Sequence, residues 1–381
     1  MKILHVTPYF YGAWAYGGIP RLSYHLAAAQ AALGHTVHAV TTDALDATSR
    51  RAADDYDVSG VSVRVYRNVS NRAAYHFQFF CPLGRGAESS RIKDYDVVHI
   101  HGHRNLLNTG MAEYAAQAGV ATVLMPNGTL VNIERRQTLK KIYDALWGKK
   151  QVARTRALVA VSEAERRQFV ELGLGDKKIR VIPNGVEMET LVDNRSFKEE
   201  FGIKGDYVLY LGKITPRKGI EHALAALPLL DDQSIALIVA GNDMGFAREL
   251  KKRARELSVG GRVIFTGLVT GKMKAAAYRE ALFTVYAGQD EIFGLVPWES
   301  ILCGTPVIVA DDSGCGEWIR AGEAGHVVRY GDPRAIAEAI NSRDRDGDEA
   351  MVQRGIIFCR ERLSWSRIAE EMIEYYREIM T

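Results

Sequence analysis

The sequence predicts two α/β domains, each built on a doubly wound parallel sheet, that face each other across a central cleft. Three observations predict this fold class. The chain has 381 residues, which is enough for two ordinary domains. Short runs rich in β-branched residues alternate with helical patterns, which is typical of parallel sheets. These runs fall into two sets with a polar segment between them, so each set indicates a sheet of its own.

The first set of predicted strands precedes residue 187. Its members are Lys2–Val6, Thr36–Thr42, Val61–Val65, Asp96–His101, Ala121–Met125, Ala157–Val161 and Ile179–Ile182. The second set comprises Tyr207–Leu211, Ile235–Ala240, Arg262–Thr266, Leu282–Tyr286, Pro306–Ala310 and His326–Arg329. Between the sets, Ile182-Pro-Asn-Gly-Val186 is a turn signal, and the polar stretch that continues to Lys204 is the expected linker.

We therefore expect a first domain over residues 1–187 and a second over residues 188–364. The amphipathic segment Trp365–Met380 suits packing on either domain, so a C-terminal helix at about 365–381 is able to return to the first one. Ligands of open α/β sheets bind beyond the carboxyl ends of the strands. The loops that follow the predicted strands are therefore where a site is expected.

Composition and charge exclude several classes of protein. With 47% hydrophobic and 25% charged residues, the chain is not disordered, collagen-like or a coiled coil. Its net charge of +3 argues against a nucleic-acid partner. Residues 1–187 hold 24 basic and 16 acidic residues, a charge of +8, whereas the remainder holds 25 and 30, a charge of −5. An anionic partner surface is therefore expected to meet the first half.

The cysteines and the apolar runs indicate a location. The four cysteines form no C-x-x-C pair and are too sparse for a disulfide framework, which fits a reducing compartment and makes a structural zinc site unexpected. No run of about 18 apolar residues occurs, and the apolar run at the N-terminus is too short for a signal peptide. We expect a cytoplasmic protein.

A basic segment in the first half is a candidate for contact with the inner face of the cell membrane. Residues 135–156 hold eight cations against Asp144 alone, and these are Arg135, Arg136, Lys140, Lys141, Lys149, Lys150, Arg154 and Arg156. Between them lie Ile142, Tyr143, Leu146 and Trp147 at helical spacing. Such a helix is able to lie on an anionic leaflet. The alternative is a helix that packs on the core and presents a solvated basic face. The aromatic run at residues 75–80 is likewise either a second membrane contact or part of the core.

Two glycine-containing loops are candidate phosphate sites. Tyr16-Gly17-Gly18-Ile-Pro-Arg21 precedes a predicted helix at Leu22–Leu33, where backbone N–H groups are able to approach an anion, although a plain flexible loop explains it as well. The segment Gly212–Gly219 brings together Lys213, Arg217 and Lys218, a combination suited to a diphosphate. A solvated basic turn is the alternative, and the Walker spacing is absent.

The most specific signal is Glu291-Ile-Phe-Gly-Leu-Val-Pro-Trp-Glu299. Glu291 is expected in a loop and Glu299 about two turns into the helix that follows. Carboxylates accept hydrogen bonds from vicinal hydroxyls, so the pair is able to hold a ribose and a hexose. The alternative is that Glu291 only caps the helix and Glu299 only forms a surface ion pair.

Taken together, these motifs resemble those of the retaining GT-B glycosyltransferases of family 4. The segment Glu291–Ile308 is similar to the family's pair of glutamates, Gly212–Gly219 to its phosphate loop, and Ile182–Val186 to its Pro-Asn-Gly-Val linker; Val161-Ser162-Glu163 and the Gly17-Gly18 loop fit as well. The resemblance implies two Rossmann-like domains. It also implies transfer of a sugar from a UDP- or GDP-sugar to a glycan or lipid-linked acceptor, with no cofactor or metal.

The resemblance also implies roles for single residues. Glu299 would bind the ribose, and Glu291 would bind the hydroxyls of the donor sugar. Lys213 and Lys218 would neutralise the diphosphate. At position 213 the family usually has Arg, so this chain has a point charge there in place of a planar guanidinium. The backbone of Phe293, Gly294, Leu295 and Val296 would lie against the sugar and diphosphate, and the base near Thr266 and Gly267. His101, at the end of a strand, would face the reaction centre, and His99 on the same strand face would be structural. Asn127 replaces a His of the family pattern.

Other functions remain open at this point. The fold would also suit a nucleotide-sugar epimerase, a glycan phosphorylase with pyridoxal phosphate, or a non-catalytic module that binds nucleotide sugars. A metal-dependent GT-A transferase would need an Asp-x-Asp site after a strand. Asp94-Tyr-Asp96 and Asp55-Tyr-Asp57 have the letters, but the first pair precedes a predicted strand. The resemblance to the retaining family implies a front-face mechanism, in which the departing phosphate accepts the acceptor's proton. Catalysis would then consist of positioning and charge stabilisation.

Overall fold

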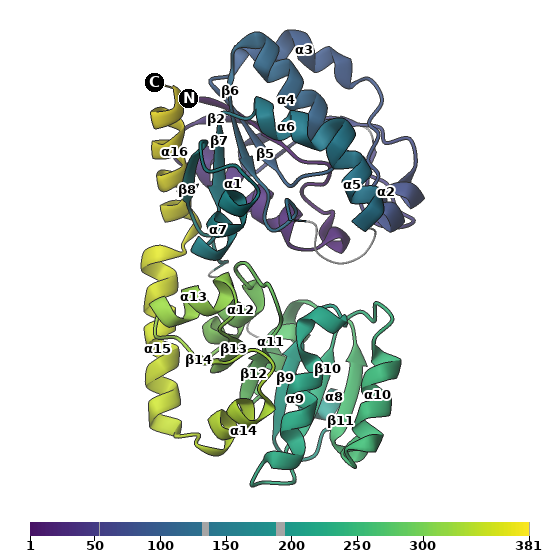
Figure 1. The fold of residues 1–381 in the computed structure, drawn as a ribbon, viewed down its shortest axis with the longest axis vertical. Coiled ribbons are helices and arrows are strands. Elements are labelled where there is room, and N and C mark those ends of the chain that lie inside the picture. Colours follow the sequence, from purple (N-terminus) through teal and green to yellow (C-terminus); the bar gives the residue numbers. More distant parts are fainter. Residues whose placement is uncertain (53, 132–136, 188–194, 381) are drawn as a thin grey trace. The chain divides into compact units, whose positions relative to one another are not determined.

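The computed structural model describes residues 1–52, 54–131, 137–187 and 195–380. It divides the chain into two compact units (Figure 1). The first comprises Met1–Gly185 together with Trp365–Thr381, and the second comprises Val186–Ser364. Each unit is built on a sheet of mainly parallel strands with helices beside it, so the predicted α/β class is confirmed.

The sheet of the first unit has eight strands in the order β3-β4-β2-β1-β5-β6-β7-β8. They are β1 (Lys2–Val6), β2 (Thr36–Thr42), β3 (Tyr56–Val58), β4 (Val61–Tyr66), β5 (Val97–His101), β6 (Ala121–Met125), β7 (Ala157–Ala160) and β8 (Lys178–Val181). The helices are α1 (Gly18–Ala32), α2 (Asn71–Phe77), α3 (Glu88–Arg91), α4 (Leu106–Ala118), α5 (Gln137–Tyr143), α6 (Lys149–Arg154), α7 (Glu163–Glu171) and α16 (Trp365–Met380). A π-helical turn, Asp144–Gly148, joins α5 to α6.

The central strands are apolar along their length because helices cover both faces of the sheet. Every residue of β5, β6 and β7 is buried. Strands buried on two faces read as continuous hydrophobic runs rather than as an alternation. The seven strands predicted for this half are all present, with ends within one residue, whereas the short β3 was missed because its three residues pair antiparallel with β4 at the sheet edge.

The C-terminal helix α16 belongs to the first unit. It carries a buried stripe of Ile368, Ala369, Met372, Ile373, Tyr375, Tyr376 and Ile379. This stripe packs against α1 and β6. The amphipathic pattern alone suited either domain, and the packing partner is decided by the shape of the surface that receives the stripe.

The sheet of the second unit has six strands in the order β11-β10-β9-β12-β13-β14. They are β9 (Tyr207–Leu211), β10 (Ala236–Ala240), β11 (Val263–Gly267), β12 (Phe283–Tyr286), β13 (Val307–Ala310) and β14 (His326–Val328). The helices are α8 (Phe197–Glu200), α9 (Ile220–Ala226), α10 (Ala247–Glu256), α11 (Gly271–Arg279), α12 (Leu295–Leu302), α13 (Gly314–Ala321), α14 (Pro333–Asn341) and α15 (Arg345–Arg362). All six predicted strands are present.

Two local predictions need correction. The polar stretch expected as linker up to Lys204 contains α8, whose Phe197 is fully buried in the core of the second unit, so this part is folded rather than linking. Residues 188–194 of that stretch lie outside the described residues. The helix expected from Leu22 begins at Gly18, since Gly17 already occupies the N-cap with a φ of 110°.

The two chain segments that connect the units are each held locally. In the first unit a Cβ on Gly185 would lie 2.4 Å from the Trp365 ring, so only glycine permits that close packing. In the second unit the Val186 N–H donates to Leu363 O at 2.8 Å. These contacts tie the predicted Pro-Asn-Gly-Val turn to the start of the C-terminal helix. Among the described residues, no helix combines the length and apolar character needed to cross a membrane.

Candidate active site

Both sheets reverse their strand order at one point, and the candidate residues follow the strands at these points. In the second unit the chain runs outward from β9 to β11 and then restarts on the other side with β12, so the reversal lies between β9 and β12. In the first unit it lies between β1 and β5. The loops at such a reversal diverge and leave room for a ligand beyond the carboxyl ends of the strands.

The basic turn after β9 packs directly on the loop after β12. Gly219 has a φ of +65°, and a Cβ there would lie 2.0 Å from Ala287 O. Glycine is therefore required both by its backbone conformation and by the close approach. The Gln289 N–H donates to Arg217 O at 2.7 Å, which fixes the two loops together. This packing brings Arg217 and Lys218 to Glu291.

Glu291 is bound by the basic turn and by a tyrosine. The Lys218 ammonium contacts Glu291 Oε1, and the Tyr286 hydroxyl donates to Oε2 at 2.8 Å. Arg217 Nη2 lies 3.9 Å from Oε1, and the Glu291 side chain is 13% exposed. Burial by itself would raise the pKa of Glu291, but the charge and hydrogen bond of Lys218, together with Tyr286 and Arg217, lower it below its usual value. Glu291 is thus held as a carboxylate.

Glu299 has a parallel set of partners from another helix. It lies on α12, where Lys274 Nζ is 2.8 Å from Oε1 and the Tyr278 hydroxyl donates to Oε2 at 2.9 Å. Lys274 and Tyr278 are four residues apart on α11 and therefore share one helix face. The cap interpretation of Glu291 does not hold, because Gly294 occupies the N-cap of α12 without a side-chain cap. Glu299 does form an ion pair, with Lys274, as the alternative interpretation expected.

The other residues of the second unit that were predicted to bind the donor lie at or after the carboxyl ends of its strands, whereas Gly17 caps and Gly18 begins α1 of the first unit. Lys213 is exposed, and its carbonyl accepts a hydrogen bond from the Tyr210 hydroxyl at 2.8 Å. Phe293 is buried, Gly294 caps α12, and Leu295 and Val296 begin that helix. Thr266 and Gly267 end β11, with Gly267 exposed. The predicted residues of the second unit thus lie after β9, at the end of β11 and after β12.

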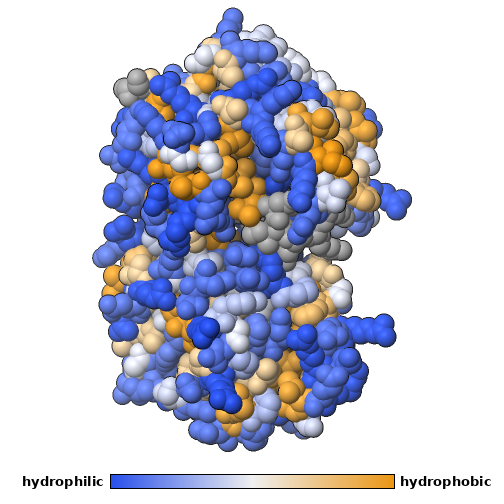
Figure 2. Space-filling model, viewed as in Figure 1, coloured by the Kyte–Doolittle hydropathy of each residue, from blue (hydrophilic) through white to orange (hydrophobic). Residues whose placement is uncertain are grey.

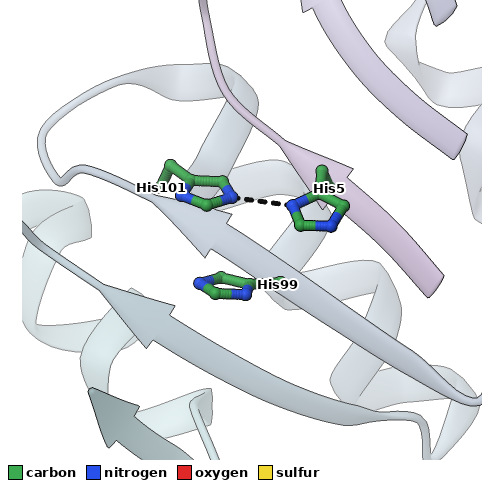
Figure 3. A group of neighbouring side chains, drawn as sticks. All are labelled: His5, His99 and His101. Atoms are coloured by element: carbon green, nitrogen blue, oxygen red, sulfur yellow. Dashed lines mark hydrogen bonds between the residues drawn. The ribbon is translucent and has the colours of Figure 1, made fainter. Parts of the chain in front are cut away.

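In the first unit, three histidines form a buried group between β1 and β5 (Figure 3). His5 on β1 is the register partner of His99 on β5, and His101 follows on the same face. The His101 Nε2 and His5 Nδ1 atoms are 2.8 Å apart. His99 is 0% and His101 1% exposed, so burial does not separate the two.

Neighbouring side chains fix the hydrogens of these rings. Gln30 Oε1 lies 2.8 Å from His5 Nε2 and accepts its hydrogen, while Gln30 Nε2 donates to the Tyr376 hydroxyl of α16. His5 Nδ1 is then an acceptor, so His101 carries its hydrogen on Nε2 and leaves Nδ1 bare. Burial lowers the pKa of all three histidines, that of His5 to about 4. The group is neutral at physiological pH.

The three histidines do not form a metal centre in this arrangement. They are the group of possible metal ligands that the described residues bring together, with ligand atoms within 4.8 Å of one another. However, the His99 and His101 rings are stacked at 4.2 Å with 11° between their planes. Metal ions bind imidazole in the ring plane, so two stacked rings cannot both point a lone pair at one ion.

Three of the four acids in the Asp-x-Asp pairs considered for a metal accept hydrogen bonds from the first sheet. Asp96 accepts the Lys2 N–H at 2.7 Å, and Asp55 accepts the Val65 N–H at 3.0 Å. Asp57 accepts from the Ser62 hydroxyl at 2.6 Å. These three carboxylates bind residues of β1 and β4, and in neither pair do the described contacts join the two acids at a common point. These contacts favour a role of the acids in holding the sheet together over a role in binding a metal.

Sequence reasoning missed the residues that hold the two glutamates and His101. Tyr278, Tyr286 and Lys274 were overlooked because tyrosines within apolar strands and helices read as core. His5 was overlooked because its partner His101 is 96 residues away. One sequence signal was available for Tyr286, since it ends a buried strand five residues before Glu291 and a buried phenol needs a partner.

Family models and known relatives match both halves of the chain. Residues 16–190 match the family described as Glycosyltransferase Family 4, and residues 193–355 match Glycosyl transferases group 1. A phosphatidyl-myo-inositol mannosyltransferase of Mycobacterium leprae is 30% identical over 76% of this chain and 75% of its own length. A D-inositol 3-phosphate glycosyltransferase of Acidothermus cellulolyticus is 32% identical over 60% of this chain, which spans 54% of that relative.

Solved structures share the fold at low sequence identity. Sucrose-phosphate synthase from Thermosynechococcus elongatus superposes with a TM-score of 0.73 at 19% identity, over 99% of this chain and 98% of that one. Anabaena HepE in complex with UDP gives 0.72 at 18% identity, over 99% and 100%. The matched family models show that the chain belongs to family 4 of the glycosyltransferases, and its two Rossmann-like units have the GT-B fold.

Proposed function

We propose that this glycosyltransferase transfers a sugar, with retention of anomeric configuration, from a UDP- or GDP-sugar to a glycan or a lipid-linked acceptor. The observation that carries the proposal is the joint placement of Glu291, Lys218 and Glu299 around the reversal point of the second sheet. A nucleoside diphosphate sugar needs a cation for its diphosphate and carboxylates for two sets of vicinal hydroxyls. Relatives named for inositol phosphate and phosphatidylinositol acceptors support a phosphorylated or lipid-linked acceptor.

The proposed mechanism relies on positioning and charge. Glu299 holds the ribose and Glu291 the transferred sugar, while Lys213 and Lys218 stabilise the charge that grows on the diphosphate as the glycosidic bond breaks. The leaving phosphate oxygen accepts the proton of the attacking hydroxyl. Both glutamates are already engaged by Lys and Tyr partners, which suits hydroxyl ligands better than a glycosidase acid and nucleophile pair. His101 would offer its bare Nδ1 to a hydroxyl group at the first unit.

Thermal unfolding in the presence of single nucleotide sugars tests the proposal. A bound donor raises the unfolding temperature by an amount set by its affinity and concentration. We expect a UDP- or GDP-sugar to stabilise the protein and to be consumed once a suitable acceptor is added. Stabilisation without turnover, over a panel of glycan and lipid-linked acceptors, would instead favour a non-catalytic module; interconversion of the sugar without an acceptor would favour an epimerase.

Donor transfer is expected to proceed without a divalent metal. The cations at 213 and 218 would supply the positive charge that a metal supplies in other transferases, and Asp55, Asp57 and Asp96 of the Asp-x-Asp pairs already accept hydrogen bonds from the protein. Transfer rates should be the same in EDTA as in manganese. Loss of activity in EDTA and its recovery with manganese would contradict the assignment.

A surface of the first unit supports docking on an anionic membrane. Of the apolar residues expected along one edge, Ile142, Leu146 and Trp147 are 50%, 50% and 40% exposed, whereas Tyr143 is half-buried and its hydroxyl lies 2.7 Å from the Thr109 hydroxyl. Leu139 on the same segment is 57% exposed. Phe77 and Phe79 are 61% and 49% exposed, although Phe80 of the same run is buried. Figure 2 shows hydrophobic side chains on the surface of this unit. Arg135 and Arg136 lie outside the described residues.

We expect binding to vesicles to require acidic phospholipid and to fade as salt rises, because the Debye length falls from about 10 Å at 0.1 M to about 3 Å at 1 M. Reversing Lys140, Lys141, Lys149 and Lys150 to Glu should abolish sedimentation with such vesicles and leave donor hydrolysis intact. A matched control reverses Arg248, Lys251, Lys252 and Arg255 on α10 of the second unit, and this variant should still sediment. If the unaltered protein ignores acidic vesicles at low salt, a soluble glycan becomes the expected acceptor.

A further inference from the structure

Tyr286 joins the two charged groups that the proposed function places on the donor. Its hydroxyl lies 3.1 Å from Lys218 Nζ and 2.8 Å from Glu291 Oε2, and the ammonium is 5.3 Å from the centre of its ring. The tyrosine is 6% exposed and ends β12, directly before the loop on which the basic turn packs. It therefore lies beneath the charged pair rather than beside it in solvent.

The direction of these hydrogen bonds is fixed by chemistry. Burial and the neighbouring Glu291 raise the pKa of Tyr286 well above its usual value, so the hydroxyl keeps its hydrogen. An ammonium only donates and a carboxylate only accepts. The Tyr286 oxygen must then accept from Lys218 and donate to Glu291, which closes a ring of three contacts with the direct contact between Lys218 and Glu291.

Counting donors and acceptors shows what this ring leaves for a ligand. An ammonium has three N–H groups, and Lys218 uses one on Glu291 and one on Tyr286, so one remains. Each carboxylate oxygen of Glu291 has one lone pair engaged and one left. One cationic donor and two acceptors at a single point suit a phosphate group that is attached to a sugar with adjacent hydroxyls.

We propose that Tyr286 is a positioning residue of the donor site, which holds the Glu291 carboxylate and the Lys218 ammonium so that the carboxylate faces the sugar hydroxyls and the remaining ammonium hydrogen faces the diphosphate. This inference rests on the proposed function for the identity of the ligand. The geometry of Tyr286, Lys218 and Glu291 is independent of the proposed function. Without the hydroxyl, Lys218 and Glu291 would neutralise each other in a geometry set only by their direct contact.

The variant Tyr286→Phe tests the role because it removes the hydroxyl and keeps the ring. We expect kcat/KM to fall roughly 10- to 100-fold, as for the loss of a hydrogen bond to a charged group. Most of the fall should lie in kcat, with donor affinity from calorimetry changing less. The control Tyr207→Phe also loses the hydroxyl of a buried tyrosine, which donates to Ala277 O at 2.7 Å in the core of the same unit, and should keep kcat.

The pH dependence gives a readout that a merely structural role would not move. The titratable groups around the Glu291 carboxyl are Lys218, Tyr286 and Arg217, with Tyr210 and Cys315 also in reach. Lys218, Tyr286 and Arg217 together hold the pKa of Glu291 below its usual value, so activity should be lost only as pH falls through that low value. Loss of the Tyr286 hydrogen bond raises the pKa, so Tyr286→Phe should lose activity at a higher pH. Tyr207→Phe should not.

Titration of the Glu291 carboxyl by NMR with ¹³C-labelled glutamate, assigned with Glu291→Gln, provides a measurement that needs neither donor nor turnover. We expect a low value in the unaltered protein and a higher one in Tyr286→Phe. Equal values in the two proteins, an unshifted value in the unaltered protein, or equal kcat would each overturn the inference. Failure of every nucleotide sugar to stabilise the unaltered protein would instead overturn the proposed function, with the carboxyl titration unaffected.

Discussion

Replacing Lys218 with alanine should reduce kcat by roughly 100- to 1000-fold, the range found when one fixed donor to a developing negative charge is removed. The reason is that charge grows on the diphosphate as the glycosidic bond breaks, so the ammonium interacts more strongly with the transition state than with the bound donor. Donor affinity should therefore fall much less than kcat. Steady-state kinetics together with calorimetry of the donor separate the two effects.

The structure adds a complication to this variant. Lys218 is the main partner of the Glu291 carboxylate, so its removal leaves a buried charge with Tyr286 and the more distant Arg217. The double variant Lys218→Ala with Glu291→Gln removes that charge and shows how much of the loss belongs to the diphosphate. Lys252→Ala, at an exposed ion pair with Glu256 on α10, is the matched control. An unchanged kcat in Lys218→Ala would remove Lys218 from the mechanism.

Replacing Glu299 with alanine should weaken donor binding by about 1–3 kcal/mol, since two acceptors for ribose hydroxyls are lost. The remaining partners, Lys274 and Tyr278, offer only donors at that point and cannot replace a carboxylate. The measurement is calorimetry with the nucleoside diphosphate alone, which reports the ribose contact without the sugar.

Two further variants make this result specific. Glu256→Ala removes an exposed glutamate of the same unit and should leave donor affinity unchanged. Tyr278→Phe keeps the carboxylate but frees one of its oxygens, and its effect should be smaller than that of Glu299→Ala. If nucleotide affinity is the same with and without Glu299, the ribose assignment is wrong.

The fold and the local positions of the two glutamates follow from local sequence patterns. The thirteen predicted strands are all present because buried parallel strands produce continuous apolar runs that a reader can see without knowing their order. The loop position of Glu291 and the helical position of Glu299 follow from a glycine that starts α12 between them. The segment 135–156 was predicted as one helix, but within its described residues a π-helical turn begins at Asp144, whose carboxylate is bound by Arg104.

What the sequence determined by itself is the set of chemical groups: two glutamates eight positions apart, a basic turn bounded by glycines, and histidines at the end of one strand. Only the tertiary structure decided their partners. Tyr286 meets Lys218 because β9 and β12 are neighbours, and His5 meets His101 because β1 and β5 are neighbours, across 68 and 96 residues of chain. Parallel strands need long crossovers, so adjacent strands are far apart in sequence and their order leaves no local signal.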